Sequence, residues 1–218
     1  MILVRFLAHL CKVFIFPSFC ASCKIFLDTE CALCKECIQK IQPIASKVIQ
    51  LTTKKTLKVH AIGVYDQPLI SLILAKSSGN RAISRQLGIL IWQLSVVRYL
   101  DFDYIVPIPL HWSRYAWRGY NQAYEMAKVI AKESHKPIML FLKRARRTPY
   151  QIYFKKDERF TNLAHSFELN CDSRNHAGKK LLLVDDVMTS GATLYHAARA
   201  LQKLRPEKIE AVVIARVG

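Results

Sequence analysis

The feature that most constrains the fold is an apolar run that leads into two adjacent carboxylates. Residues 180–194 read KLLLVDDVMTSGATL. A short, continuously apolar run of this kind is typical of a strand that is buried on both faces of a sheet. The hydroxyl residues and the glycine that follow predict a turn, and the pattern of residues 191–204 predicts a helix. The sequence therefore predicts a strand whose carboxyl end carries two carboxylates and opens directly into a helix.

The rest of the chain alternates between strand-like and helix-like patterns. We expect further strands at 58–66, 102–110, 138–143 and 209–217. We expect helices at 68–76, 81–100 and 121–134, and a helix with a connector at 41–58. Strands that alternate with helices indicate an α/β fold, in which a parallel sheet is flanked by helices. A chain of 218 residues is long enough for one such domain and a small appendage.

The turn after the two carboxylates has the composition of an anion site. In an open α/β sheet, ligands bind beyond the carboxyl ends of the strands, where Asp185 and Asp186 are expected. The free N–H groups and the dipole at the start of a helix favour a phosphate. We expect the phosphate on the segment Thr189, Ser190, Gly191, Ala192 and Thr193, where the glycine allows close approach. The carboxylates would then face sugar hydroxyls or a hydrated Mg²⁺, which prefers oxygen ligands.

Two other interpretations of this stretch are open. In the first, Ser190 or Thr193 caps the helix and the aspartates complement its dipole. That role requires neither a second carboxylate nor the whole string of hydroxyl and glycine residues. In the second, the paired aspartates form a Mg²⁺ phosphotransfer site, as in receiver or phosphatase folds. That site needs a nucleophilic aspartate spaced from its partners, which the sequence does not show.

The chain is strongly basic. It has 33 Lys and Arg residues against 16 Asp and Glu residues, and a formal net charge of +17. Such an excess attracts a polyanion, either a nucleic acid or an anionic membrane surface, unless it is only a solvated surface with no partner. The hydrophobic share of 51% and the charged share of 22% are those of a globular protein and exclude a disordered chain.

The first sixteen residues are mostly apolar but carry Arg5, His9 and Lys12. The run is shorter than the roughly 20 apolar residues of a transmembrane helix, and it lacks the small-residue cleavage site of a signal peptide. The spacing of the three polar residues is that of one face of an amphipathic helix. We expect this helix either to pack on its own domain or to contact a membrane surface.

Five of the seven cysteines fall in one short segment. They include Cys20-x-x-Cys23 and Cys34-x-x-Cys37, a pattern typical of tetrahedral Zn²⁺ coordination, although Cys31-x-x-Cys34 has the same spacing. An iron–sulfur cluster and buried inert thiols are the alternatives. Paired spacing favours a metal over a disulfide framework, and so a reducing compartment. We therefore expect a structural Zn²⁺ and a cytoplasmic protein, with or without membrane association.

Residues 181–194 resemble the phosphoribosyl-diphosphate (PRPP) binding motif of type I phosphoribosyltransferases, in which an apolar strand runs through two acids, Thr/Ser and Gly into a helix. The resemblance implies the type I phosphoribosyltransferase fold for residues 57–218. Residues 1–50 would then hold the N-terminal amphipathic segment and a small zinc-binding segment with four cysteine ligands. The resemblance also implies that the protein binds PRPP together with Mg²⁺.

Two further sequence blocks, residues 106–127 and 142–167, indicate a particular family among the phosphoribosyltransferase-like proteins. Together with the cysteine segment they resemble the ComF/ComFC family of competence-associated phosphoribosyltransferase-like proteins over nearly the whole chain. The matching residues are Pro107, Pro109, Leu110, Arg114, Arg118, Gly119, Asn121, Gln122, Arg144, Arg146, Thr148, Gln151, Arg159, Asn162 and Phe167. The departures from the family pattern are Tyr120 for Phe, Phe154 for Leu, Ser190 for Thr, and the absence of an aromatic residue after Lys76.

The resemblance also implies roles for particular residues. The family pattern favours Cys34 and Cys37 as metal ligands over Cys31. A pyrophosphate loop is implied beside the carboxylate turn, with Lys76, Arg114 and Arg118 as its residues. One guanidinium group can bind two phosphate oxygens at once. The alternative is that Arg114 and Arg118 only form surface ion pairs. The segment 143–166 corresponds to the flexible loop that closes over PRPP in such enzymes.

The function implied by the resemblance is to handle or transport single-stranded DNA during natural transformation, in company with other competence proteins. Cations beside aromatic rings suit single strands without sequence preference. The residues expected to make this contact are Arg144, Arg146, Arg147, Lys155, Lys156 and Arg159. Two alternatives are a nucleobase phosphoribosyltransferase of salvage and a non-catalytic regulator that senses PRPP. The acceptor, and with it any catalytic residue, is left unassigned.

Overall fold

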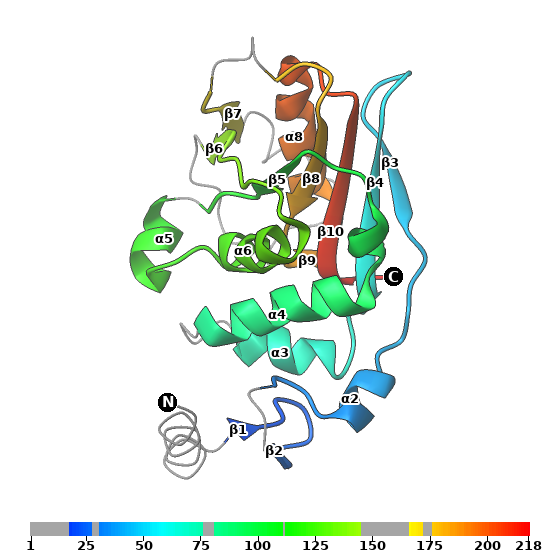
Figure 1. Cartoon of the computed structure of the whole chain (residues 1–218), viewed down its shortest axis with the longest axis vertical. Coiled ribbons are helices and arrows are strands. Elements are labelled where there is room, and N and C mark those ends of the chain that lie inside the picture. The colour runs from blue at the N-terminus through cyan, green and yellow to red at the C-terminus, as the bar shows by residue number, and fades with distance from the viewer. Residues whose placement is uncertain (1–17, 28–30, 76–80, 111, 145–165, 172–175) are drawn as a thin grey trace.

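The computed structural model describes most of the chain. The described residues are 18–27, 31–75, 81–110, 112–144, 166–171 and 176–218. They form one central sheet, helices on both of its faces, and a small cysteine-bearing segment near the N-terminal end (Figure 1). The amphipathic helix predicted at 1–16 lies outside the described residues.

The central sheet has six strands in the order β3-β4-β10-β8-β5, with β9 beside β10. The strands are β3 (Lys47–Gln50), β4 (Thr56–Val64), β5 (Tyr104–Pro107), β8 (Lys180–Val184), β9 (Val187–Met188) and β10 (Lys208–Arg216). Every pair in the sheet is parallel except β3 with β4. Strands β8 and β10 are buried along most of their length, which is why their sequences are continuously apolar. The predicted α/β fold with a mostly parallel sheet is confirmed.

Helices cover both faces of this sheet. On one face, α3, α4 and α6 form a buried cluster with Ile105, Leu182 and Val212. On the other face, α8 and the short antiparallel pair β6–β7 form a second cluster with Val106 and Leu183. These elements are α3 (Leu69–Ala75), α4 (Arg81–Leu94), α6 (Gln122–Ser134), α8 (Ala192–Leu201), β6 (Leu142–Arg144) and β7 (Phe167–Leu169).

The predicted helix and connector at 41–58 is wrong. Residues 47–50 instead form β3, which pairs in antiparallel register with β4 from Lys47 opposite Val59 to Gln50 opposite Thr56. The connecting turn is closed by the N–H of Lys55, which donates to Thr52 Oγ1 at 3.1 Å. The β-branched pair in this strand favours extended backbone. Pairing with the edge of β4, which the local pattern does not reveal, sets the extended conformation of this segment.

Two other predicted elements are shorter than expected. The helix predicted at 81–100 divides into α4 and a 3-10 turn, η2 (Val96–Tyr99), because Ser95 Oγ accepts a backbone N–H at 3.2 Å and starts a new turn. The strand predicted at 138–143 is reduced to one bridge between Ile138 and Ile105, followed by β6. Two further helical pieces are η4 (Gln202–Leu204) and α5 (Trp112–Arg118). Helix α5 lies apart from the sheet on the β5 side (Figure 1).

The cysteine segment packs against the sheet domain rather than standing free. It consists of β1 (Ser18–Phe19), β2 (Phe26–Leu27) and α2 (Lys35–Gln39). Its buried residues Leu27 and Leu33 belong to the same cluster as the apolar residues of α3 and α4. Across the described part of the chain, no helix combines the length and the apolar character that crossing a bilayer demands.

Candidate phosphate-binding turn and metal cluster

The carboxylate turn is anchored to the neighbouring strand. Strand β8 ends at Val184, and the N–H of Asp185 then donates to the carbonyl oxygen of Val212 at 3.1 Å. The carbonyl oxygen of Asp186 accepts the N–H of Ile214 at 2.9 Å. The side chain of Asp185 also accepts the N–H of Asp186 at 2.9 Å. The backbone that carries both carboxylates is therefore fixed by β10, while the side chains stay half-buried at the end of the sheet.

Gly191 determines how the turn enters α8. Its φ of 83° lies in the left-handed region, and it is the N-cap residue of the helix. A Cβ at this position would lie 2.7 Å from Met188 Cε and 3.0 Å from Ile49 Cδ1. Only glycine fits here, both in conformation and in space. The first helical hydrogen bond runs from the N–H of Tyr195 to Gly191, so the N–H groups before it lie outside the helical ladder.

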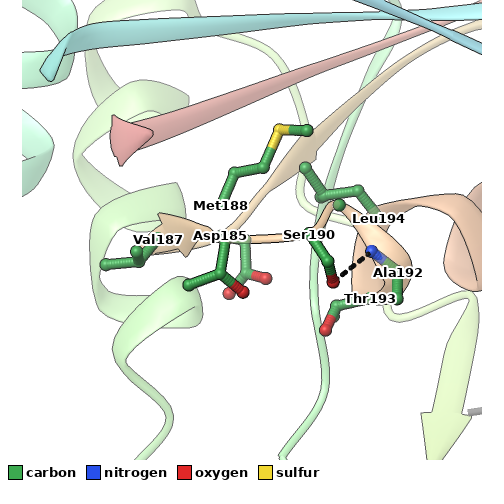
Figure 2. A pocket seen from close by; sticks show the side chains of 9 residues that line it. Asp185, Val187, Met188, Ser190, Ala192, Thr193 and Leu194 are labelled. Carbon is green, nitrogen blue, oxygen red and sulfur yellow. Dashed lines mark hydrogen bonds between the residues drawn. The ribbon is translucent and has the colours of Figure 1, made fainter. Parts of the chain in front are cut away.

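The polar side chains of the turn face a common side. Figure 2 shows the oxygens of Asp185, Ser190 and Thr193 on one side of the turn and the side chain of Met188 on the other. Six of the seven predicted residues line this small pocket; Asp186 is the exception. The N–H of Ala192 donates to Ser190 Oγ at 3.4 Å. A helix N-terminus that also presents hydroxyls and N–H groups outside the helical ladder can hold a phosphate. The adjacent carboxylate oxygens suit sugar hydroxyls or a hydrated Mg²⁺.

The loop after β5 leaves the sheet next to this turn. Pro107 is the strand partner of Val184, and the N–H of Ile108 donates to Val184 O at 2.9 Å. This neighbour relation was predicted. Arg114 lies on α5, with its side chain outside the described atoms, and Arg118 is half-buried at the end of that helix. Among the described residues Arg118 does not line the pocket of the turn, and Lys76 lies outside the description.

A larger cleft of about 740 Å³ begins at the end of β5 and lies among α5, α6 and β6. Arg144 is the one predicted nucleic-acid contact within the described residues, and it lines this cleft with its guanidinium 5.4 Å from the ring centroid of Phe167. The other predicted contacts, Arg146, Arg147, Lys155, Lys156 and Arg159, lie outside the described residues.

The cleft contains one buried carboxylate, Glu125. It pairs with Arg85 Nε at 3.0 Å and with Lys128 Nζ at 2.9 Å. Burial raises the pKa of Glu125, but the two cations outweigh burial and hold its pKa below the ordinary value. The carboxylate is therefore ionised and neutralised by its partners.

Four cysteine sulfurs converge in the N-terminal segment. Cys20, Cys23, Cys34 and Cys37 present their Sγ atoms within 4.8 Å of one another, and those of Cys23 and Cys34 are 3.7 Å apart. Zn–S bonds of about 2.3 Å in a tetrahedron place sulfurs roughly 3.8 Å apart. Cys31 is exposed and is not part of this group. The cluster is consistent with a structural metal such as zinc, in the register that pairs Cys34 with Cys37.

The thiols of Cys20 and Cys34 differ in acidity. Burial raises the pKa of Cys20, but backbone N–H groups, that of Cys34 among them, outweigh it and bring the pKa to about 6. The N–H of Cys37 lowers the pKa of Cys34, but Glu36, burial and the neighbouring thiols raise it to about 12. Without metal, the cluster at neutral pH thus holds the thiolate of Cys20 beside the protonated thiol of Cys34. A divalent metal that binds all four sulfurs must displace the remaining protons.

Some residues of the cleft were not singled out from the sequence. They are Arg81, Tyr124, Glu125, Lys128 and Asn170. They belong to α4, α6 and the segment after β7, which lie far apart in the chain. No local pattern joins them, and only the fold brings them together.

Comparison with known proteins gives a consistent result. The family described as phosphoribosyl transferase domain matches residues 104–218. Competence protein F of Haemophilus influenzae is 28% identical over 208 residues, which are 92% of this chain and 85% of that protein. Competence protein ComFC of Bacillus subtilis is 36% identical over 99 residues, which are 44% of this chain and 37% of that protein.

Two solved structures show weak likeness. An adenine phosphoribosyltransferase matches 83% of this chain and 89% of its own at 12% identity, with a TM-score of 0.42. The UMP synthase of Leishmania donovani matches 68% of this chain and 24% of its own at 20% identity, with a TM-score of 0.39. At these scores neither bears on the chemistry of the site.

Proposed function

The chain belongs to the phosphoribosyl transferase domain family and, within it, to the ComF/ComFC competence proteins, and from this premise we propose that it binds PRPP with Mg²⁺ and handles single-stranded DNA during natural transformation. A phosphoribosyltransferase domain implies a PRPP-type ligand. The observation that carries the PRPP part is Gly191, whose left-handed backbone starts α8 directly after the carboxylates and whose crowded surroundings admit only glycine.

Different groups of the turn bind different parts of PRPP in this proposal. The 5′-phosphate of PRPP binds the N–H and hydroxyl groups of residues 189–193, where the helix dipole favours negative charge. Asp185 and Asp186 face the ribose hydroxyls and the Mg²⁺. When bound, the Mg²⁺ neutralises pyrophosphate oxygens and keeps several of its own waters. The pyrophosphate extends toward the loop after β5, which leads to Arg114 and Arg118 on α5, and these two arginines supply positive charge. Lys76, the third cation of this proposal, lies outside the described residues.

The cysteine cluster holds a structural Zn²⁺ in this proposal. Its sulfurs already lie at separations that suit tetrahedral coordination. The metal stabilises the fold of the cysteine segment, in which few of the described residues are buried. In this proposal residues 1–50 form a unit beside the domain of residues 57–218. Cysteines in paired metal-binding spacing suit a reducing compartment, and a cytoplasmic location is therefore part of the proposal.

The DNA part of the proposal draws on charge and on the cleft beside the turn. The net charge of +17 attracts a polyanion. The cleft at the end of β5 is lined by Arg81, Lys128, Lys143 and Arg144 and by several aromatic rings. Cations beside rings suit a single strand more than a duplex, because only unpaired bases expose their faces for stacking.

The proposal is tested by measuring both ligands on the same zinc-loaded protein. PRPP should raise the melting temperature in the presence of Mg²⁺, because it binds only the folded state. Replacing both Asp185 and Asp186 by Asn should abolish this shift, whereas Asp101→Asn, at an exposed carboxylate paired with Lys180, should leave it intact. Labelled single-stranded oligonucleotides should bind, and the logarithm of their affinity should fall linearly with the logarithm of the salt concentration.

The other outcomes identify the alternatives. Release of pyrophosphate from PRPP that depends on an added nucleobase would show a salvage transferase. PRPP binding with no turnover and no oligonucleotide binding would leave a PRPP sensor. A protein that shows neither PRPP binding nor oligonucleotide binding would contradict both parts of the proposal.

A further inference from the structure

The cleft beside the carboxylate turn is a separate site with its own lining. Its volume of about 740 Å³ lies within the roughly 300–1,000 Å³ of small-molecule sites. It begins at Pro107, whose strand partner is Val184, the residue before Asp185. None of the residues that line the pocket of the turn lines this cleft. A ligand in the cleft would therefore lie next to PRPP without competing for its groups.

Aromatic rings form one part of the lining. Trp112 and Tyr115 face the cleft from α5 and are 73% and 53% exposed. Tyr120 and Tyr124 line the same cleft, and a cation lies over each ring: Arg81 at 5.5 Å and Lys128 at 5.0 Å from the ring centroid, respectively. Exposed rings in a concave, cationic surface are typical of platforms on which unpaired bases stack.

Charge forms the other part of the lining. The cations that face the cleft are Arg81, Lys128, Lys143 and Arg144. The one carboxylate among the described lining residues, Glu125, is already held by Arg85 and Lys128. Among the described residues, Lys143 pairs with the exposed Glu168 outside the cleft, at 3.2 Å, and it can exchange this partner for a phosphate at small cost. The cleft as a whole is therefore electropositive and suits a phosphate backbone.

We propose that this cleft binds unpaired nucleotides of a single strand, with bases stacked on Trp112 and Tyr115 and phosphates on Lys143 and Arg144. The inference rests on the proposed function in DNA handling and adds where the strand lies. Stacking on rings is tolerant of sequence, because every base has a π-face. A free nucleobase or nucleotide shares this chemistry, so the experiment must separate the two sources.

The test measures binding of a fluorescently labelled oligothymidylate to the full-length, zinc-loaded protein. Trp112→Ala and Tyr115→Ala should each weaken binding by about fivefold or more, the lower end of what a lost stacking contact removes. Trp112→Phe keeps a ring and should bind nearly as the wild type does. The matched control is Tyr99→Ala, since Tyr99 is 74% exposed and lies outside the cleft. Circular dichroism and melting curves check that each variant folds.

The charge arm uses salt dependence. Removing one phosphate contact on a single strand lowers the slope of log affinity against log salt by about 0.7. We expect this change in Lys143→Ala. The matched control is Lys203→Ala, which removes an exposed positive charge that does not line the cleft and should leave the slope unchanged.

The outcomes separate this inference from the proposed function. If the wild type binds the oligonucleotide and the cleft variants bind it equally well, the inference is overturned and DNA handling stands. If the wild type binds no oligonucleotide, the inference and the DNA part of the proposal both fail, while PRPP binding is untouched. If thymidine monophosphate binds as tightly as the oligonucleotide and loses affinity in the same variants, the cleft is a free-nucleotide site and the strand is excluded.

Discussion

The backbone N–H of Ile108 donates to the carbonyl oxygen of Val184 over 2.9 Å, at the point where β5 and β8 both end. The carboxylate turn and the loop that leads to α5 therefore leave the sheet side by side. This one contact places the proposed PRPP site and the adjoining cleft at a common edge. Two polyanionic ligands bound there would lie within range of each other's charge.

Binding of PRPP and of a single strand should consequently be coupled. At low salt we expect each ligand to weaken the other, because their charges repel, and we expect the effect to fade as salt screens it. By thermodynamic linkage, PRPP must change the affinity for the oligonucleotide by the same factor as the oligonucleotide changes the affinity for PRPP. Oligonucleotide titrations with and without PRPP, and the reverse titrations, measure both factors. Identical oligonucleotide affinity with and without PRPP at low salt would contradict the shared edge.

Gly191→Ala should disrupt the turn. The new Cβ would meet Met188 Cε at 2.7 Å, and the left-handed backbone would be strained. We expect a loss of about 1–2 kcal/mol for the backbone and a further loss of about 1–3 kcal/mol for the overpacking.

Gly178→Ala is the matched control for that change. Gly178 has a φ of 71°, but among the described residues no heavy atom lies within 4 Å of its Cβ position. Gly178→Ala should lose only the part of the unfolding free energy that comes from backbone strain, and it should still bind PRPP. Urea denaturation measures both variants, and equal losses in the two would show that the packing around Gly191 is not restrictive.

Much of this turn could be predicted from the sequence, because the strand, the carboxylates and the glycine are consecutive. The sequence could not predict that Ile49 lies where a Cβ at position 191 would meet it. Ile49 lies on β3, whose strand character depends on pairing with β4 rather than on its own pattern. The cysteine pairs were visible as local spacing, but the choice between Cys31 and Cys37 needed either the family pattern or the converging sulfurs. The cleft joins α4, α5, α6 and β6, and nothing local in those segments predicts their meeting.

Cys20→Ser should remove the metal, whereas Cys31→Ser should retain it. Cys20 contributes one of the four converging sulfurs, and Cys31 is exposed outside the cluster. Elemental analysis of the purified variants measures the zinc content per chain. Since the metal must displace thiol protons, the affinity of the wild type should fall as the pH falls. Cys37→Ser should lose the zinc as Cys20→Ser does, because Cys37 belongs to the same cluster. Loss of zinc from Cys31→Ser with retention in Cys37→Ser would reverse the assigned register.

Glu210 should contribute to stability in a pH-dependent way. It is buried, accepts His60 Nε2 at 3.1 Å and pairs with Lys208 Nζ at 2.7 Å. Burial raises the pKa of Glu210, but Lys208 and His60 outweigh burial and hold the pKa below its ordinary value of 4.5. A lowered pKa in the folded state gives stability that is fully present above the ordinary value and is lost as the pH falls below it.

Glu210→Gln should therefore lower the free energy of unfolding by about 1–3 kcal/mol near neutral pH. It should also flatten the decline of that free energy in acid. Glu207→Gln is the control, because Glu207 is 59% exposed and pairs with Lys180 only at 3.5 Å. It should change stability by less than about 0.5 kcal/mol. Equal acid sensitivity in Glu210→Gln and the wild type would assign the acid transition to other groups.

The PRPP site itself is tested most directly by calorimetric titration of the zinc-loaded protein with PRPP, with Mg²⁺ and without it. We expect saturable binding to a single site that requires Mg²⁺ and is absent when Asp185 and Asp186 are both replaced by Asn. Absence of any binding to the wild type, or equal binding to the doubly substituted protein, would show that the carboxylate turn is not the PRPP site.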